Sequence, residues 1–311
     1  MLNTSSGALR LPLRSGERAE PLHMKIAVIG APGQFGSDLV RLARERRLGV
    51  IALSHQDCDV RDRASLDRAL ADIGPGDAVV NTAAMNKTED CELLPAATVE
   101  VNVHGAYHAA LAAAARGATP VYISTDYVFD GTKKTPYVES DPTLPLSVYG
   151  SSKAAGEALV RLNKQHYIMR VSSLFGVAGN RGKGGNFVET MLVQGQRGES
   201  PRVVDDIVSS PTSTADAAAL LLDLLERKAP TGTYHLSNEG AVSWREFADE
   251  IFAQCRMRVR AEPIRIKDLP MGVRRPAYSA MTSEKLGALG LKARPWREAL
   301  SDYLKAKGHV K

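Results

Sequence analysis

Short apolar runs alternate with segments of helical periodicity over the first half of the chain. Continuous apolar strands separated by helices are typical of βαβ units in a parallel sheet that is covered on both faces. The pattern therefore predicts an α/β fold, with a Rossmann-like doubly wound parallel sheet. The expected strands are 25–29, 50–53, 78–81, 120–124 and 166–171, and the expected helices are 34–46, 64–73, 96–116 and 148–162.

This alternation weakens after about Gly176. Helical stretches are expected at 187–196, 213–227 and 243–254, and the period-two pattern of 256–260 predicts an exposed strand. We expect three parts: a flexible tail at 1–23, a dinucleotide-binding Rossmann domain at 24–176, and a smaller C-terminal α/β lobe at 177–311. The last part is expected to be mainly a substrate-binding lobe, with some segments returning to the Rossmann sheet.

Composition and charge exclude several classes of protein. The 311 residues carry 40 Lys and Arg against 35 Asp and Glu, a net charge of +5 that suits a small anionic ligand. The basic residues are too dispersed to predict nucleic-acid binding. No apolar run approaches the ~20 residues of a membrane span. Cys58, Cys91 and Cys255 lack metal or disulfide spacing, which indicates free thiols in a reducing, cytoplasmic compartment.

Three glycines, Gly30, Gly33 and Gly36, stand between the first strand and the first helix. Glycine there permits a tight turn and a close approach of backbone to a pyrophosphate, which the helix N-terminus also attracts. The motif predicts a dinucleotide cofactor site that includes Gln34 and Phe35.

The choice of cofactor depends on the residues just after the second strand. No acid stands in Ser54-His55-Gln56, which leaves room for a 2′-phosphate that Ser54, His55 or Arg61 would approach. Asp59 and Val60 come slightly later and would meet the adenine edge. This favours NADPH, with NADH as the alternative.

Tyr149 and Lys153 are four residues apart on a predicted helix and therefore share one face. A nearby ammonium lowers the pKa of a phenol, and the pair can then exchange a proton with a carbonyl or alcohol oxygen. Thr125 ends a predicted parallel strand, at the edge where open α/β sheets bind ligands. No metal site is expected, because His104 and His108 lack a third ligand.

Together these segments resemble the extended short-chain dehydrogenase/reductase superfamily and, within it, the dTDP-4-dehydrorhamnose reductase family. The match runs from about Met24 to about Leu304. It includes the glycine turn, Asn81-Thr-Ala-Ala84, Ser124-Thr-Asp-Tyr-Val-Phe-Asp-Gly131, Val148-Tyr-Gly150 with Lys153 and Gly156-Glu157, Gly185-Asn-Phe187, Arg274-Arg-Pro276 and Pro295-Trp-Arg-Glu298.

The resemblance implies reduction of the 4-keto group of a nucleotide-linked 6-deoxysugar by NADPH or NADH, as in dTDP-rhamnose biosynthesis. It implies that Tyr149 donates the proton, that Lys153 lowers the pKa of Tyr149 and binds the nicotinamide ribose, and that Thr125 orients the keto oxygen. A homodimer is also expected. The implied lining residues are Ala83 and Ala84 for the cofactor, and Asp126, Tyr127, Asn186 and Arg275 for the substrate.

Two alternatives stay open. One is a sugar-nucleotide epimerase or dehydratase of the same superfamily, although a dehydratase typically has Asp-Glu where this chain has Asp126-Tyr127. The other is a non-catalytic NADP-binding regulatory subunit, because the regulatory β subunit of methionine adenosyltransferase resembles this reductase family and such proteins can retain the Tyr and Lys.

Overall fold

The structure is a computed structural model that describes residues 24–179, 185–268 and 272–310. The predicted tail at 1–23 lies outside these ranges. Six of the described strands form one parallel sheet in the order β10-β5-β4-β3-β1-β2, which confirms the predicted fold class. The strands are β1 Lys25–Ile29, β2 Gly49–Leu53, β3 Ala78–Asn81, β4 Thr119–Thr125, β5 Tyr167–Val171 and β10 Gly232–His235.

The order of the strands fixes where a ligand can enter. After β2 the chain crosses back over β1 to add β3 on the other side, so the carboxyl ends of β1 and β3 flank a topological switch point. Open α/β sheets bind their ligands in the crevice at such a point. We therefore expect a ligand to bind at the loops that follow β1, β2 and β3.

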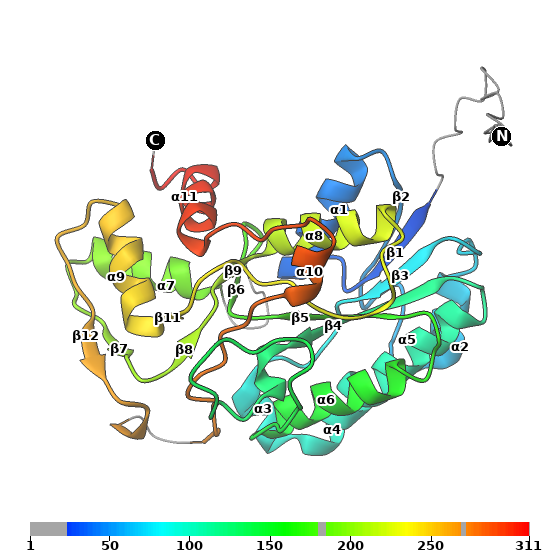
Figure 1. The fold of residues 1–311 in the computed structure, drawn as a ribbon, viewed down its shortest axis with the longest axis horizontal. Helices are drawn as coiled ribbons and strands as arrows, with labels where there is room; N and C mark the ends of the chain where they lie inside the picture. The colour runs from blue at the N-terminus through cyan, green and yellow to red at the C-terminus, as the bar shows by residue number, and fades with distance from the viewer. Residues whose placement is uncertain (1–23, 180–184, 269–271, 311) are drawn as a thin grey trace, which may run out of the picture.

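Helices cover both faces of this sheet (Figure 1). One face packs against α1 (Gln34–Glu45) and α8 (Thr214–Glu226) through an apolar core that includes Leu39 and Leu221. The opposite face carries α2 (Arg63–Ala69), α3 (Thr88–Leu93), α4 (Pro95–Val99), α5 (Gly105–Ala114) and α6 (Val148–Val160).

The long helix predicted at 96–116 is interrupted. A π-helical segment, Glu100–His104, joins α4 to α5. His104 Nδ1 lies 3.0 Å from a carboxylate oxygen of Glu100, and His108 Nδ1 lies 3.2 Å from the Val60 carbonyl oxygen. The described residues contain no group of three His, Cys, Asp or Glu side chains arranged to hold a metal ion.

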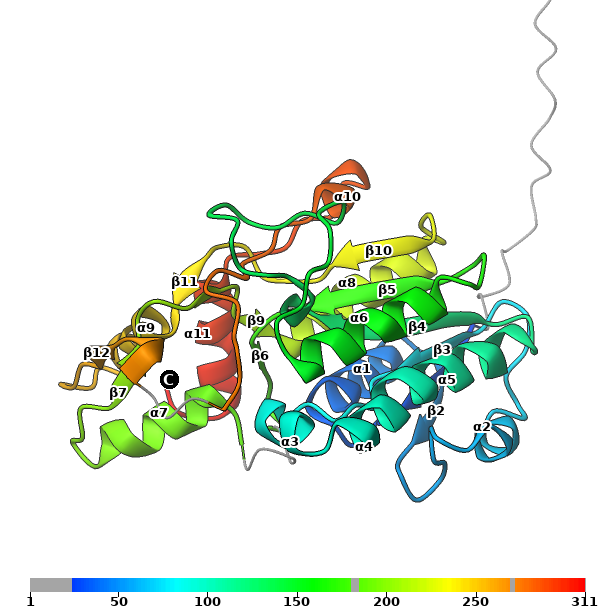
Figure 2. The same cartoon turned by 90° about the horizontal axis from the view of Figure 1, so that it is seen from below.

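A smaller lobe faces the carboxyl ends of the strands (Figure 2). It has its own apolar core, in which Phe247, Trp296 and Leu300 are buried. Its helices are α7 (Phe187–Gln196), α9 (Trp244–Gln254) and α11 (Trp296–Ala306). Its short strands are β7 (Arg202–Val204) with β12 (Glu262–Ile264), β8 (Val208–Ser209) with β11 (Val242–Ser243), and β6 (Leu174–Phe175) with β9 (Thr212–Ser213).

The strand predicted at 256–260 is wrong. Helix α9 ends at Gln254, Arg256 has a φ of 54°, and β12 begins only at Glu262. Met257 and Val259 are partly buried against the lobe core, while the arginines that alternate with them, at 256, 258 and 260, are exposed. The alternation of apolar and basic residues at 256–260 therefore belongs to an irregular segment that lies on the surface of the lobe.

Two further features bear on the class of protein. None of the described helices combines the length and apolar character that crossing a membrane requires. None of the described cysteines, Cys58, Cys91 and Cys255, is part of a disulfide, and the first two are buried.

Candidate active site

A cavity of about 1390 Å³ opens between the carboxyl edge of the main sheet and the smaller lobe. It is bordered by the ends of β1, β4 and β5 on one side and by α7, α9 and β7 on the other. The structure brings every predicted site residue to this cavity. These are Gly30, Gly33, Gln34, Phe35, Gly36, Ser54, Asp59, Val60, Ala83, Ala84, Thr125, Asp126, Tyr127, Tyr149, Lys153, Asn186 and Arg275.

The glycine turn after β1 has no room for side chains. Gly30 has a φ of 82°, and a Cβ atom there would lie 2.6 Å from the Thr82 hydroxyl oxygen. A Cβ atom on Gly36 would lie 2.5 Å from the Gly30 carbonyl oxygen. Helix α1 starts directly after Gly33 and has no side-chain cap. Its first N–H groups and partial positive charge therefore suit the pyrophosphate of a dinucleotide.

The end of β2 is tied to this turn. The backbone N–H groups of Gly30 and Ala31 both donate to the Leu53 carbonyl oxygen, at 2.9 and 3.0 Å. Ser54, the next residue, consequently lies beside the glycine turn and lines the cavity. This is where the adenosine ribose of a dinucleotide lies in a doubly wound fold.

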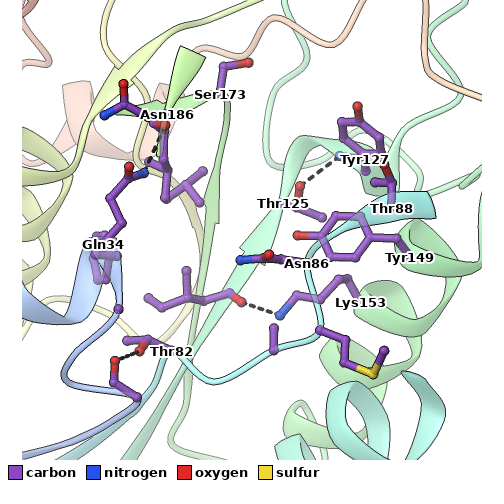
Figure 3. A pocket seen from close by; sticks show the side chains of 18 of the residues that line it. Gln34, Thr82, Asn86, Thr88, Thr125, Tyr127, Tyr149, Lys153, Ser173 and Asn186 are labelled. Atoms are coloured by element: carbon purple, nitrogen blue, oxygen red, sulfur yellow. Dashed lines mark hydrogen bonds between the residues drawn. The ribbon is translucent and has the colours of Figure 1, made fainter. Parts of the chain in front are cut away.

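The proton-transfer candidates come from β4 and α6. Thr125 ends β4, and Tyr149 and Lys153 lie on the first turns of α6. Helix α6 approaches closely because residue 150 is glycine, where a Cβ atom would lie 2.2 Å from the Tyr127 carbonyl oxygen. In Figure 3 the side chains of Thr125, Tyr149 and Lys153 lie next to one another on a single wall of the cavity.

Burial sets the proton affinities on this wall. It lowers the pKa of Lys153 to about 7, against the opposing charge of Glu157. The Lys153 Nζ atom donates to the Ile123 carbonyl oxygen at 2.6 Å and lies 3.9 Å from the Tyr122 ring centre. Burial also raises the pKa of Tyr149, although a hydrogen bond with Thr125 opposes the change. The predicted lowering of the Tyr149 pKa is therefore not seen, and the phenol is held protonated.

A buried ion pair lies behind the same wall. The Glu157 carboxylate accepts hydrogen bonds from Arg170 at 2.8 and 2.9 Å and from the Ser124 hydroxyl at 2.6 Å. Burial disfavours the ionised form of this carboxylate, but the hydrogen bonds and charge of Arg170, with the Ser124 hydrogen bond and the charge of Arg161, together keep the Glu157 pKa below its usual range. The network connects α6 to β4 and β5 next to Thr125.

Asp126 and Tyr127 continue from Thr125 into the substrate side of the cavity. The buried Asp126 carboxylate accepts from Ser172 at 2.9 Å and Ser279 at 2.6 Å. Burial nevertheless raises the pKa of Asp126. Arg275 donates to the Tyr127 hydroxyl at 3.0 Å. Asp126 thus holds the surrounding segments together, whereas Tyr127 and Arg275 form part of the cavity rim.

Asn186 is the N-cap of α7. Its side-chain oxygen accepts from the Glu189 backbone N–H at 3.1 Å, and its Nδ2 donates to the Tyr303 hydroxyl at 3.1 Å. Both ends of the amide are therefore engaged with the protein. Asn186 fixes the start of α7 on the lobe side of the cavity, where it also lines the wall.

Sequence reasoning missed several lining residues. Asn86 and Thr88 follow β3, and Figure 3 shows Asn86 close to Tyr149 and Lys153. Their position after a parallel strand was the available signal. Phe187 and Trp244 line the lobe side, with ring centres 4.7 Å apart. They lie on different helices, so no local spacing connects them.

Comparisons with known proteins identify the family of the chain. The family model described as RmlD substrate binding domain matches residues 24–308. The spore coat polysaccharide biosynthesis protein SpsK of Bacillus subtilis is 38% identical over 284 residues, covering 91% of this chain and 98% of the relative. A dTDP-4-dehydrorhamnose reductase from Streptomyces griseus is 37% identical and covers 88% of this chain and 91% of its own.

Solved structures give the same result. A dTDP-4-dehydrorhamnose reductase from Clostridium acetobutylicum has a TM-score of 0.85 and 35% identity, covering 91% of this chain and 99% of its own. The Bacillus anthracis reductase in complex with NADP has a TM-score of 0.85 and 32% identity, with the same coverage. The family expected from the sequence is confirmed: the chain belongs to the dTDP-4-dehydrorhamnose reductase family.

Proposed function

We propose that this protein uses NADPH or NADH to reduce the 4-keto group of a nucleotide-linked 6-deoxysugar, as in the conversion of dTDP-4-dehydrorhamnose to dTDP-L-rhamnose. The observation that carries the proposal is the convergence of Thr125, Tyr149 and Lys153 on one wall of a cavity whose far end is the glycine turn. Family membership identifies the substrate class.

The cofactor supplies the hydride, and the protein supplies position and a proton. The Tyr149 phenol, which burial keeps protonated, donates its proton to the keto oxygen as that oxygen gains charge. The Thr125 hydroxyl orients the same oxygen. Lys153 binds the nicotinamide ribose and, when protonated, stabilises the phenolate that Tyr149 leaves behind.

Cofactor and substrate occupy opposite ends of the cavity. Gly30, Gly33 and Gly36, with the backbone of Gln34 and Phe35, hold the pyrophosphate. Ser54, Asp59 and Val60 contact the adenosine, and Ala83 and Ala84 line the path to the nicotinamide. The lobe after Gly176 binds the sugar nucleotide, with Tyr127 and Arg275 on its rim and Asp126 and Asn186 fixing the surrounding segments.

The test is oxidation of NADPH or NADH in the presence of a dTDP-4-keto-6-deoxysugar. Tyr149→Phe should lower kcat by roughly 10²- to 10⁴-fold, the usual contribution of a general acid. Cofactor affinity, measured by fluorescence, should change little. Tyr107→Phe, on the partly exposed side of α5, is the matched control and should leave kcat unchanged.

Equal kcat in wild type and Tyr149→Phe would refute the role of the phenol. A wild-type protein that binds the cofactor but turns over none of several nucleotide-linked 4-keto sugars would instead favour the regulatory-subunit alternative. The two failures are distinct, because the first retains turnover and the second lacks it.

A homodimer in a reducing, cytoplasmic compartment completes the proposal. Leu93, the last residue of α3, and Leu94, which follows it, are 77% and 55% exposed, and apolar side chains gathered at a surface favour association. Light scattering should give twice the chain mass, and Leu93→Glu should weaken the dimer. The free thiols of Cys58 and Cys255 support the compartment.

A further inference from the structure

The loop after β2 carries a carboxylate that the spacing of the chain does not reveal. Asp57 is three residues beyond Ser54, but its side chain turns back onto that residue. One carboxylate oxygen of Asp57 accepts from both the Ser54 backbone N–H and the Ser54 hydroxyl, each at 2.7 Å. No acid directly follows β2 in the sequence, but the Asp57 carboxylate lies against Ser54 at the end of that strand.

The position of this carboxylate bears on the cofactor ribose. Leu53 is hydrogen-bonded to the glycine turn, and Ser54 lines the cavity at the end of β2. In doubly wound folds an acid at this strand end accepts a hydrogen bond from the adenosine 2′-hydroxyl, whereas a 2′-phosphate needs donors and positive charge. Asp57 already occupies the two donors of Ser54.

Arg61, the cationic residue nearest to this loop in the sequence, is already paired with a carboxylate. The Arg61 guanidinium forms a double hydrogen bond with Asp59, with its Nε 3.0 and 3.1 Å from the two carboxylate oxygens and its Nη2 2.6 Å from one of them. Asp59 and Arg61 thus neutralise each other. The groups that hold Asp57 are uncharged, and its hydrogen bonds from Ser54 keep the Asp57 pKa below its usual range. His55 also lies at this rim.

From this geometry we infer that Asp57 is a cofactor-selecting residue, which biases this reductase toward the free 2′-hydroxyl of NADH relative to the 2′-phosphate of NADPH. The inference rests on the proposed function only in requiring a dinucleotide at the glycine turn. Asp57 lies behind Ser54, which lines the cavity, so its negative charge would repel a 2′-phosphate bound at Ser54, and that phosphate would also lack the Ser54 donors. Together these effects correspond to about a tenfold difference in relative affinity.

The experiment measures the ratio of the dissociation constants of NADPH and NADH by fluorescence titration of the full chain. Asp57→Asn is the informative variant, because an asparagine oxygen still accepts from Ser54 and keeps the loop in place while the charge is lost. The matched control is Asp72→Asn, which removes the same charge from the exposed segment after α2. The Asp72 carbonyl contacts Lys25 at the amino end of β1, away from the carboxyl ends of the strands.

We expect Asp57→Asn to shift the ratio about tenfold in favour of NADPH and Asp72→Asn to leave it unchanged. The shift should shrink as salt rises from about 0.02 M to about 0.5 M, since exposed charges are screened. An unchanged ratio in Asp57→Asn, or equal shifts in both variants, would overturn the inference. Failure of the wild type to bind either cofactor would overturn the proposed function itself.

Discussion

Replacing Lys153 by methionine should stabilise the protein while abolishing its reductase activity. Lys153 is 2% exposed, and burial lowers its pKa from 10.5 to about 7. At about 1.4 kcal/mol per pH unit, that difference disfavours folding at pH 7 by roughly 4 kcal/mol. Methionine fills a similar volume without a charge, but it loses the hydrogen bond to Ile123, a loss of about 1 kcal/mol. The expected net gain is about 2 to 3 kcal/mol.

The dependence on pH tests the cause. The folded pKa of Lys153 lies below the unfolded value, so folding releases a proton between the two. Wild-type stability relative to Lys153→Met should therefore increase as pH rises from about 7 toward about 10.5. Urea unfolding of both proteins at several pH values measures this difference and cancels groups that titrate in both.

Lys164→Met, at an exposed position before β5, is the matched control and should change stability by less than about 0.5 kcal/mol. A Lys153→Met protein that is less stable than wild type at pH 7 would show that the charge is well solvated where it lies. A stability difference that does not vary with pH would likewise refute the reasoning, because desolvation of an ammonium must titrate.

Two other substitutions test the walls of the cavity. Glu157→Gln should reduce the free energy of unfolding by about 3 to 5 kcal/mol, because Arg170 would remain buried without its counter-charge, while Glu226→Gln in a surface ion pair should lose less than about 1 kcal/mol. A loss below about 1 kcal/mol at Glu157 would contradict this account. Gly36→Ala should weaken cofactor binding at least about tenfold by fluorescence, since its Cβ would meet a carbonyl oxygen at 2.5 Å. Gly74→Ala, which meets nothing within 4 Å, should bind normally, and equal affinity in both variants would argue against a cofactor at this turn.

Local pattern was sufficient for the first five strands of the sheet. Each is a short apolar run next to a helix, and burial on both faces leaves that signal intact in the sequence. Strand β10 was not assigned, because Gly232–His235 reads Gly-Thr-Tyr-His and is not an apolar run. Its hydrogen bonds to β5 create the strand, and that pairing joins residues about sixty positions apart.

In the candidate site, too, the features that local spacing determines were predicted, and the contacts between distant residues were not. The glycine turn and the Tyr149–Lys153 pair depend on spacing within one loop or one helix, so the sequence predicted their shared cavity. The fold-back of Asp57 onto Ser54 depends on loop conformation. The contact between Lys153 and the Ile123 carbonyl joins α6 to β4 across thirty residues. Neither contact has a periodic signature.

Burial of Lys153 lowers the stability of the folded protein, and the same burial gives the lysine a pKa that suits the proposed reaction. A lysine in solvent stays charged throughout the neutral range, whereas one with a pKa of about 7 exchanges its proton near neutral pH. Glu157, one helical turn away, offsets only part of this burial, because its carboxylate is already engaged by Arg170 and Arg161. Freeing Glu157 from Arg170 would direct more negative charge at Lys153 and raise its pKa. The buried ion pair therefore does more than connect α6 to the sheet, since it limits how strongly the ammonium is stabilised. In the proposed mechanism, this keeps Lys153 able to respond when Tyr149 gives up its proton.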